Sequence, residues 1–236
     1  MSQSLALPRF AAAIAGGLVV SCQAPAGHPL RDTATIRRIA EAAVLGGALA
    51  IRCGGAGGAA DIAAVAAAVD VPVIGLTKTG SRGVFITPTL EAAIDVVEAG
   101  ADVVAVDGTG RPRPDGRTLA ATVEAVHDAG RLLMADVSTL EEGVVAAFLG
   151  ADVIATTLAG YTTNSAVPHD PDLALVEALR GQLPHTVIVA EGRYNTPELA
   201  AAALAAGADA VVVGTAITDI AWTTRRFAGA MRLPRA

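Results

Sequence analysis

Lys78 stands out for its chemistry, because it is the only lysine among the 236 residues of this chain. The other sixteen of its seventeen Lys and Arg residues are arginines, whose guanidinium groups stay protonated in proteins. A buried amine loses its proton more readily, and it can then serve as base, acid or Schiff-base nucleophile. Lys78 follows the apolar run 73–77 and precedes a glycine-containing loop, 79–83. A leftover surface lysine is the alternative, but position and scarcity favour a catalytic role.

Glu191 is the carboxylate best placed to work with this amine. It ends another apolar run, 187–190, and is followed by a glycine. An amine and a carboxylate that face one cavity can move a proton on and off a carbon next to a carbonyl or acetal. The alternative is a structural ion pair between Glu191 and Arg193 or Arg52.

A recurring pattern places both residues at the ends of strands. Helical stretches end in Gly-Ala-Asp, and a β-branched run follows at once, as at 98–107, 149–157 and 206–214. Glycine ends a helix, and Val or Ile then suits a strand that is buried on both faces. We predict strands at 17–21, 48–52, 73–77, 103–107, 132–136, 153–157, 187–191 and 211–214, separated by helices.

Eight such βα units predict an α/β fold, a single (β/α)8 TIM barrel that occupies residues 1–236 as one domain. An open, doubly wound sheet is the alternative, but no GxGxxG follows the first predicted strand. Barrel chemistry lies where the strands end, so the polar residues there should converge. They are Gln23, Arg52, Lys78, Asp107, Asp136, Thr156, Thr157, Glu191, Arg193 and Thr215.

The loops after the last two strands carry small residues, Gly192, Gly214 and Thr215. Backbone amides in these loops bind phosphate in many barrels, and Arg193 is a candidate charged contact. For Gly214 alone, a glycine needed only for a tight turn is an equal alternative.

Composition excludes several classes of function. The net charge is −6 and no basic cluster spans more than a few residues, which argues against nucleic acid as a partner. The longest apolar runs fall short of the ~20 residues that span a membrane. No His or Cys has the spacing of a metal site, so we expect no metal.

Two isolated cysteines, Cys22 and Cys53, indicate a reducing, cytoplasmic setting. The stretch 9–22 superficially resembles a lipoprotein signal, but Gly16 and Gly17 interrupt it and the barrel needs it as the first strand.

The chain resembles the N-acetylmannosamine-6-phosphate 2-epimerases of sialic acid catabolism over nearly its whole length. The stretches that carry this resemblance are 21–23, 50–52, 75–78, 84–89, 111–116, 133–139, 155–162, 190–197 and 213–218. The resemblance implies a metal- and cofactor-independent interconversion of N-acetylmannosamine 6-phosphate and N-acetylglucosamine 6-phosphate. The catalytic lysine and glutamate of the family fall on Lys78 and Glu191. Its substrate-contacting residues fall on Gln23, Arg52 and Asp136.

Two departures bear on the substrate. The loop after Lys78 is shorter than is usual in the family and lacks its aromatic residue, and Asp219 stands where the family tends to have arginine. The expected partner is a phosphorylated amino sugar. The alternatives are an epimerase of another amino sugar, an aldolase-like barrel that uses Lys78 as a Schiff base, and a catalytically silent phosphosugar-binding barrel. Apolar helix faces also suggest a homodimer.

Overall fold

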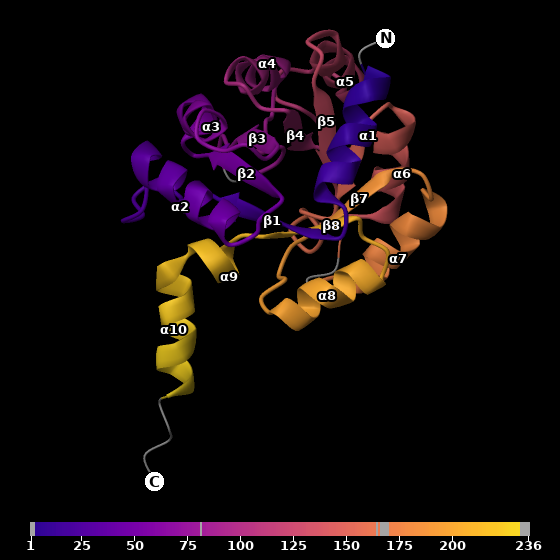
Figure 1. Cartoon of the computed structure of the whole chain (residues 1–236). Helices are drawn as coiled ribbons and strands as arrows, with labels where there is room; N and C mark the ends of the chain where they lie inside the picture. Colours follow the sequence, from indigo (N-terminus) through magenta and orange to yellow (C-terminus); the bar gives the residue numbers. More distant parts are fainter. Residues whose placement is uncertain (1–2, 81, 164, 166–169, 232–236) are drawn as a thin grey trace.

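The fold is a closed eight-stranded barrel surrounded by helices (Figure 1), seen in a computed structural model that describes residues 3–80, 82–163, 165 and 170–231. The strands are β1 (Gly17–Cys22), β2 (Ala50–Gly55), β3 (Val73–Thr77), β4 (Val103–Asp107), β5 (Leu132–Asp136), β6 (Val153–Ala155), β7 (Val187–Glu191) and β8 (Ala210–Val213). The helices are α1 (Gln3–Ile14), α2 (Thr33–Leu45), α3 (Gly58–Ala66), α4 (Leu90–Glu98), α5 (Leu119–Asp128), α6 (Leu140–Phe148), α7 (Leu173–Gln182), α8 (Pro197–Ala205), α9 (Thr215–Thr218) and α10 (Ile220–Ala230).

Every strand is parallel to its two neighbours, in chain order, and β8 pairs with β1 to close the barrel. The predicted (β/α)8 barrel is therefore confirmed. The second strand was predicted two residues early, since β2 begins at Ala50 and runs on to Gly55. Sequence analysis also missed α1 and the short α9.

The aspartates of the Gly-Ala-Asp repeats hold the strands in register. The carboxylate of Asp102 accepts a hydrogen bond from the main-chain N–H of Val73, at 3.0 Å. Asp152 and Asp209 do the same for Leu133 and Ile188, at 2.8 and 2.7 Å. Each aspartate leads into an even-numbered strand and binds the start of the preceding strand, β3, β5 or β7. The repeat therefore supplies hydrogen bonds to strand N–H groups that would otherwise lack a partner.

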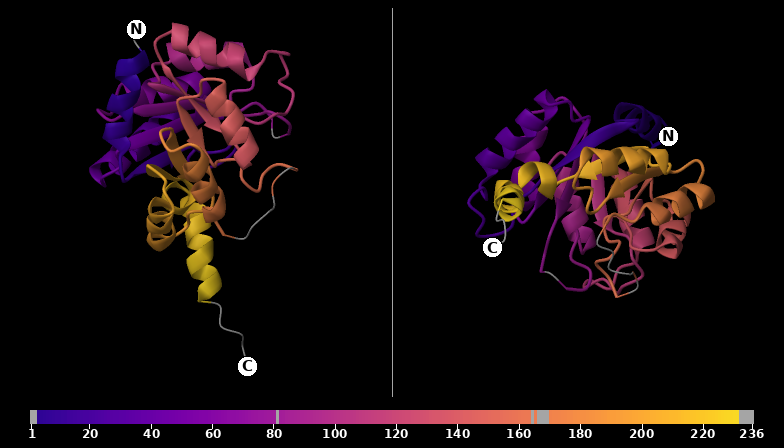
Figure 2. Two further views of the ribbon diagram at one scale, coloured as in Figure 1. Left: turned by 90° about the vertical axis from the view of Figure 1, so that its right-hand side faces the viewer. Right: turned by 90° about the horizontal axis from the view of Figure 1, so that it is seen from below.

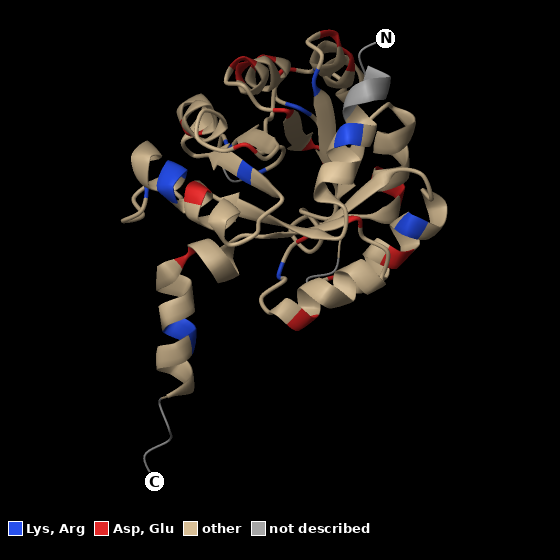
Figure 3. Ribbon diagram, in the orientation of Figure 1, with Lys and Arg blue, Asp and Glu red and all other residues tan. Residues whose placement is uncertain are grey.

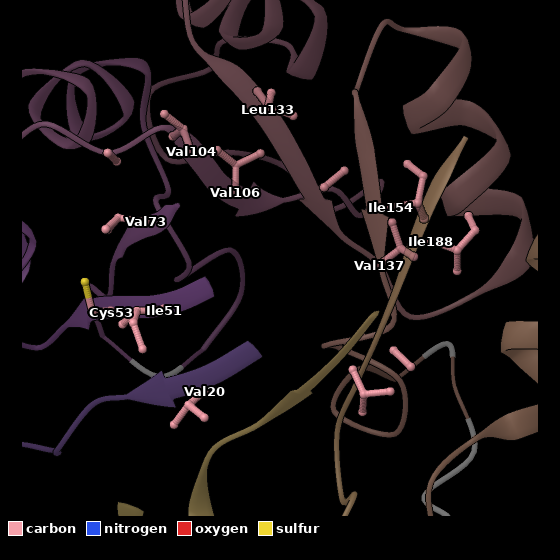
Figure 4. Close-up of a cluster of buried hydrophobic side chains, with 14 of the residues drawn as sticks. Val20, Ile51, Cys53, Val73, Val104, Val106, Leu133, Val137, Ile154 and Ile188 are labelled. Carbon is pink, nitrogen blue, oxygen red and sulfur yellow. The ribbon is translucent and has the colours of Figure 1, made fainter. Parts of the chain in front are cut away.

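Side chains alternate along each strand, so the barrel has an inner core and an outer core. Val104 and Val106 of β4 point outward and pack with residues such as Ile154 and Ile188 beneath the helices (Figure 4). The alternate residues, such as Val103 and Ala105, fill the barrel interior. Helix α1 packs against that interior through two buried side chains, Phe10 and Ile14, which are 5% and 0% exposed. The apolar run near the N-terminus thus folds as α1 followed by β1.

The helix that follows β8 departs from the pattern of the others. Figures 1 and 2 show α10 extending away from the barrel, whereas α2–α8 lie around it. No residue of α10 is buried, and Ile220, Phe227 and Met231 are 64–78% exposed. In Figure 3, basic and acidic residues are interspersed over the helices, with no continuous basic band. Among the described residues, no helix has the length and apolar character needed to cross a membrane.

Candidate active site

The alternation of side chains along the strands points the predicted site residues into one space. On β2, Ala50 faces the interior, and Arg52 has the same parity; on β7, Val189 and Glu191 are related in the same way. This parity does not hold for Thr156 and Thr215, but it holds for most of the other predicted residues at strand ends, namely Gln23, Lys78, Asp107, Asp136, Thr157, Arg193 and Gly214. All of these positions lie at the C-terminal end of the barrel.

Arg52 is at the centre of the ion pairs in this space. Its Nη1 and Nη2 donate to the two carboxylate oxygens of Asp136, at 3.1 and 2.6 Å. Its Nη1 also lies 3.2 Å from Glu191 Oε2. The side chains of Arg52 and Asp136 are 1% and 0% exposed, whereas that of Glu191 is 16% exposed. The contact between Glu191 and Arg52 that the alternative predicted therefore exists, and it leaves one carboxyl oxygen, Oε1, for other contacts.

Lys78 follows β3, across the barrel from Glu191 on β7. It is exposed at the barrel mouth, and its ammonium has no hydrogen bond to any side chain or carbonyl in the described part of the chain. Although part of the side chain reaches solvent, the protein around the ammonium group limits its hydration. This partial burial and the positive charge of Arg52 both lower the pKa of Lys78. Glu191 and Asp136 act in the opposite direction. The result is an amine that gives up its proton more readily than free lysine does.

The pKa of Glu191 shifts in the opposite direction to that of Lys78. Burial is the main cause that raises the pKa of Glu191, and the nearby carboxylate of Asp136 adds to it, while Arg52 opposes both. A carboxyl group with a raised pKa and an amine with a lowered one can act as acid and base in the same cavity.

Two threonines at the end of β6 hold Glu191 in place. Thr156 Oγ1 exchanges hydrogen bonds with the main chain of Glu191, at 2.9 and 3.0 Å. Thr157 Oγ1 lies 2.7 Å from Asp136 Oδ1 and 3.1 Å from Glu191 Oε2. Sequence analysis placed Thr157 among the polar residues that converge at the strand ends, but it did not predict this shared position between two carboxyl groups.

Gln23 has an amide oxygen available for a ligand. Its Nε2 donates to Ser21 Oγ at 2.8 Å, but Oε1 is buried and has no hydrogen-bond partner among the described residues. A side chain at position 55 would lie only 2.5 Å from this oxygen, so Gly55 keeps the space around it open. Ser21 was not predicted as a functional residue, although it precedes Gln23 by two positions and therefore faces the same way.

The loops proposed for phosphate adjoin one another. Strands β7 and β8 pair with Glu191 opposite Val212, so Gly192 and Gly214 follow neighbouring strands. Gly192 has a φ of 113°, which favours glycine, and Gly214 precedes α9, whose first residue is the exposed Thr215. These residues adjoin the end of β7 that carries Glu191, and their role in binding phosphate stays a prediction.

Arg193 is directed elsewhere. Its Nη1 donates to the carbonyl of Ala159 at 2.9 Å and its Nε to that of Asp170 at 3.1 Å. The guanidinium also stacks on Tyr161, 5.3 Å from the ring centre. In this conformation Arg193 ties the loop after β6 to the loop after β7. Its role as a charged phosphate contact stays a prediction.

Asp219 has a structural partner. Its carboxylate accepts a hydrogen bond from the N–H of Trp222 at 2.8 Å and caps the N-terminus of α10. His28 Nε2 lies 3.8 Å from the same carboxylate oxygen. The carboxylate of Asp219 is thus held at the helix N-terminus and faces a histidine.

Fold and site together define a class of protein: a (β/α)8 barrel whose strand ends carry an amine and a carboxyl group for acid–base chemistry. The described residues contain no group of three His, Cys, Asp or Glu side chains arranged to hold a metal ion. Metal independence itself stays a prediction.

Comparison with known proteins identifies the particular family. Residues 36–233 match the family described as "Putative N-acetylmannosamine-6-phosphate epimerase", and the chain belongs to this family. A relative of that description from Corynebacterium glutamicum is 49% identical over 217 residues, which cover 92% of this chain and 94% of the relative. One from Cutibacterium acnes is 47% identical over 226 residues, covering 95% and 97%.

Solved structures agree with this assignment. The N-acetylmannosamine-6-phosphate 2-epimerase from Clostridium perfringens superposes with a TM-score of 0.90 at 38% identity, covering 94% of this chain and 96% of that one. A 3-hexulose-6-phosphate synthase, at 22% identity and a TM-score of 0.60, shares the fold alone. The resemblance seen in the sequence is confirmed, and the chain is an epimerase.

Proposed function

We propose that this epimerase interconverts N-acetylmannosamine 6-phosphate and N-acetylglucosamine 6-phosphate, without a metal or cofactor. The observation that carries the proposal is the amine of Lys78 and the carboxyl of Glu191, whose pKa values shift in opposite directions within one barrel mouth. The names of the relatives supply the substrate. They also support a place in amino sugar metabolism, and we propose that the reaction belongs to sialic acid catabolism, as the resemblance in sequence implies.

The chemistry requires that one C–H bond break and re-form. In the open-chain sugar, C2 is next to the C1 aldehyde, so the electron pair of the C2–H bond can move into the carbonyl when a base removes the proton. Lys78, as a free amine, takes this proton, and Glu191 transfers a proton to and from the sugar oxygens. Return of a proton to the opposite face of C2 gives the epimer. No atom is gained or lost, and no oxidant or reductant is needed.

The other predicted residues then bind the substrate. The unpartnered Gln23 Oε1 accepts a hydrogen bond from the sugar or its amide, and Arg52, Asp136 and Thr157 form the floor beside it. Main-chain N–H groups of Gly192, Gly214 and Thr215 bind the phosphate. Arg193 contacts the phosphate only if its guanidinium leaves the two carbonyl groups that it now binds.

Proton NMR of the purified protein with N-acetylmannosamine 6-phosphate in deuterated buffer tests the proposal. The expected result is the gluco epimer with deuterium at C2, formed equally well in the presence of a metal chelator. Unphosphorylated N-acetylmannosamine is the matched control and should react more slowly, because it lacks the group that the phosphate loops bind. Turnover only with another amino sugar would contradict the proposed substrate. A borohydride-trapped adduct on Lys78 would instead indicate Schiff-base chemistry.

We further propose that the chain forms a homodimer through α10. This helix exposes Ile220 and Phe227, the residue after it, Met231, is also exposed, and the helix does not cover the barrel beside β8 (Figures 1 and 2). A second copy of the chain would cover the apolar side chains of α10 and the uncovered side of the barrel beside β8 at the same time. We also propose a cytoplasmic location, which suits the two buried free thiols, Cys22 and Cys53.

Light scattering of the purified protein checks the dimer. The expected mass is twice the 23.5 kDa of one chain. Phe227→Asp should give a monomer, since it places a charge in the proposed contact. Phe148→Asp on α6 is the matched control, because Phe148 is 89% exposed and lies outside this contact. A monomeric wild-type protein, or equal masses for the two variants, would contradict the role of α10.

A further inference from the structure

Thr157 lies between two carboxyl groups, and its hydroxyl has only one proton. Its Oγ1 is within hydrogen-bond distance of both Asp136 Oδ1, at 2.7 Å, and Glu191 Oε2, at 3.1 Å. A hydroxyl donates one hydrogen bond and accepts up to two. It can donate to only one of the two carboxyl groups. The other contact is attractive only if that carboxyl group itself supplies the proton.

Arg52 determines which carboxyl group receives the proton of Thr157. Asp136 binds both terminal nitrogens of Arg52, which is the arrangement of an ionised carboxylate. It also has the shorter contact with Thr157. Glu191 has only one neighbouring guanidinium nitrogen, Nη1 at 3.2 Å. The hydroxyl proton therefore points to Asp136, and an oxygen lone pair of Thr157 faces Glu191 Oε2.

We propose that Thr157 is a positioning residue that accepts a hydrogen bond from a protonated Glu191 Oε2 and so keeps Glu191 in its acid form in the resting enzyme. The inference rests on the proposed function, in which Glu191 handles the proton on the sugar oxygens. It deepens that function by assigning the location of the proton before substrate binds.

The proton count of the site shows why this matters. A charged Lys78 with an ionised Glu191 has the same number of protons as a neutral amine with a neutral acid. Burial disfavours both charges, since it lowers the pKa of Lys78 and raises that of Glu191. A hydrogen-bond acceptor at Glu191 Oε2 stabilises the second arrangement further. The amine of Lys78 is then free to take the C2 proton, and the protonated Glu191 lies across the barrel from it.

Infrared titration of the free protein tests the position of this proton. A protonated carboxyl group has its own carbonyl band, and the band of Glu191 is identified by its loss in Glu191→Gln. In Thr157→Val the acid form loses its acceptor, so this band should disappear about one pH unit lower than in the wild-type protein. Thr157→Ser keeps the hydroxyl and should restore the wild-type titration. Thr156→Val is the matched control, since Thr156 binds only the main chain of Glu191.

Several results would overturn the inference. If Thr157 donated to Glu191 instead, it would favour the ionised form, and Thr157→Val would move the band to higher pH. An unchanged titration, or no Glu191 band in the wild-type protein, would also exclude the role. In turnover, Thr157→Val should lower kcat about tenfold with little change in KM, and Thr157→Ser should recover it. The titration needs no substrate, so an inactive wild-type protein would contradict the proposed function alone.

Discussion

Replacing Lys78 with alanine is expected to lower kcat by about a thousandfold, within the range that a general base contributes. The reason is that no other described residue offers an amine at the barrel mouth, and the chain has no second lysine. NMR in deuterated buffer measures both turnover and deuterium incorporation at C2, and both should fall together. The fold should persist, because Lys78 is exposed and its ammonium has no hydrogen bond to the described residues.

Lys78→Arg is the matched control for charge. The variant keeps a cation at this position, but a guanidinium group stays protonated and cannot accept the C2 proton. It should therefore be as inactive as Lys78→Ala while melting at the same temperature as the wild-type protein. Activity in the arginine variant above about a tenth of wild type would show that the position needs only a positive charge.

The pH profile of the wild-type enzyme gives a second measure of the same base. Burial and Arg52 lower the pKa of Lys78, and a base works only in its unprotonated form. The ratio kcat/KM should rise as pH increases through this pKa, and the rise should lie below the value of ~10.4 for free lysine. A rise that is centred at or above that value would contradict the effect of burial.

Much of this site could be predicted because the strands alternate their side chains. Lys78 and Glu191 each follow an apolar run, and in a parallel barrel the ends of such runs meet at one mouth. The Gly-Ala-Asp repeats marked where each of three strands begins. They were interpreted as junctions between a helix and the next strand, and the hydrogen bonds that Asp102, Asp152 and Asp209 make to neighbouring strands were not predicted. Such bonds depend on pairing between residues far apart in the chain.

Features beyond the strand ends could not be predicted for the same reason. The direction of Arg193 depends on carbonyl groups in the loop after β6, which no local pattern specifies. The position of α10 depends on which surface covers its apolar residues, and no such surface adjoins it within the described chain. Asp219 was interpreted from its charge, whereas its capping bond to Trp222 determines where that charge lies. In each case a contact from outside the local sequence decides the geometry.

The largest expected effect on stability comes from the ion pair of Arg52 with Asp136, whose side chains are 1% and 0% exposed. Removing one partner of a buried pair leaves an uncompensated charge, which typically costs about 3–5 kcal/mol. Arg52→Met keeps most of the side-chain volume, so packing changes little and the charge accounts for most of the loss. The free energy of unfolding should fall by that amount in urea titrations, with the slope against urea unchanged.

The double variant Arg52→Met with Asp136→Leu separates charge from packing. It removes both charges, and replacing a buried pair by apolar side chains is often neutral or even stabilising. The double variant should therefore be more stable than Arg52→Met alone, although it is expected to be inactive. If the single variant unfolds at the wild-type urea concentration, the pair is not held in a dry interior.

The comparison also bears on catalysis, because Arg52 is the cation that lies against Glu191 and lowers the pKa of Lys78. The same guanidinium would then both compensate the buried charge of Asp136 and help to lower the proton affinity of the base.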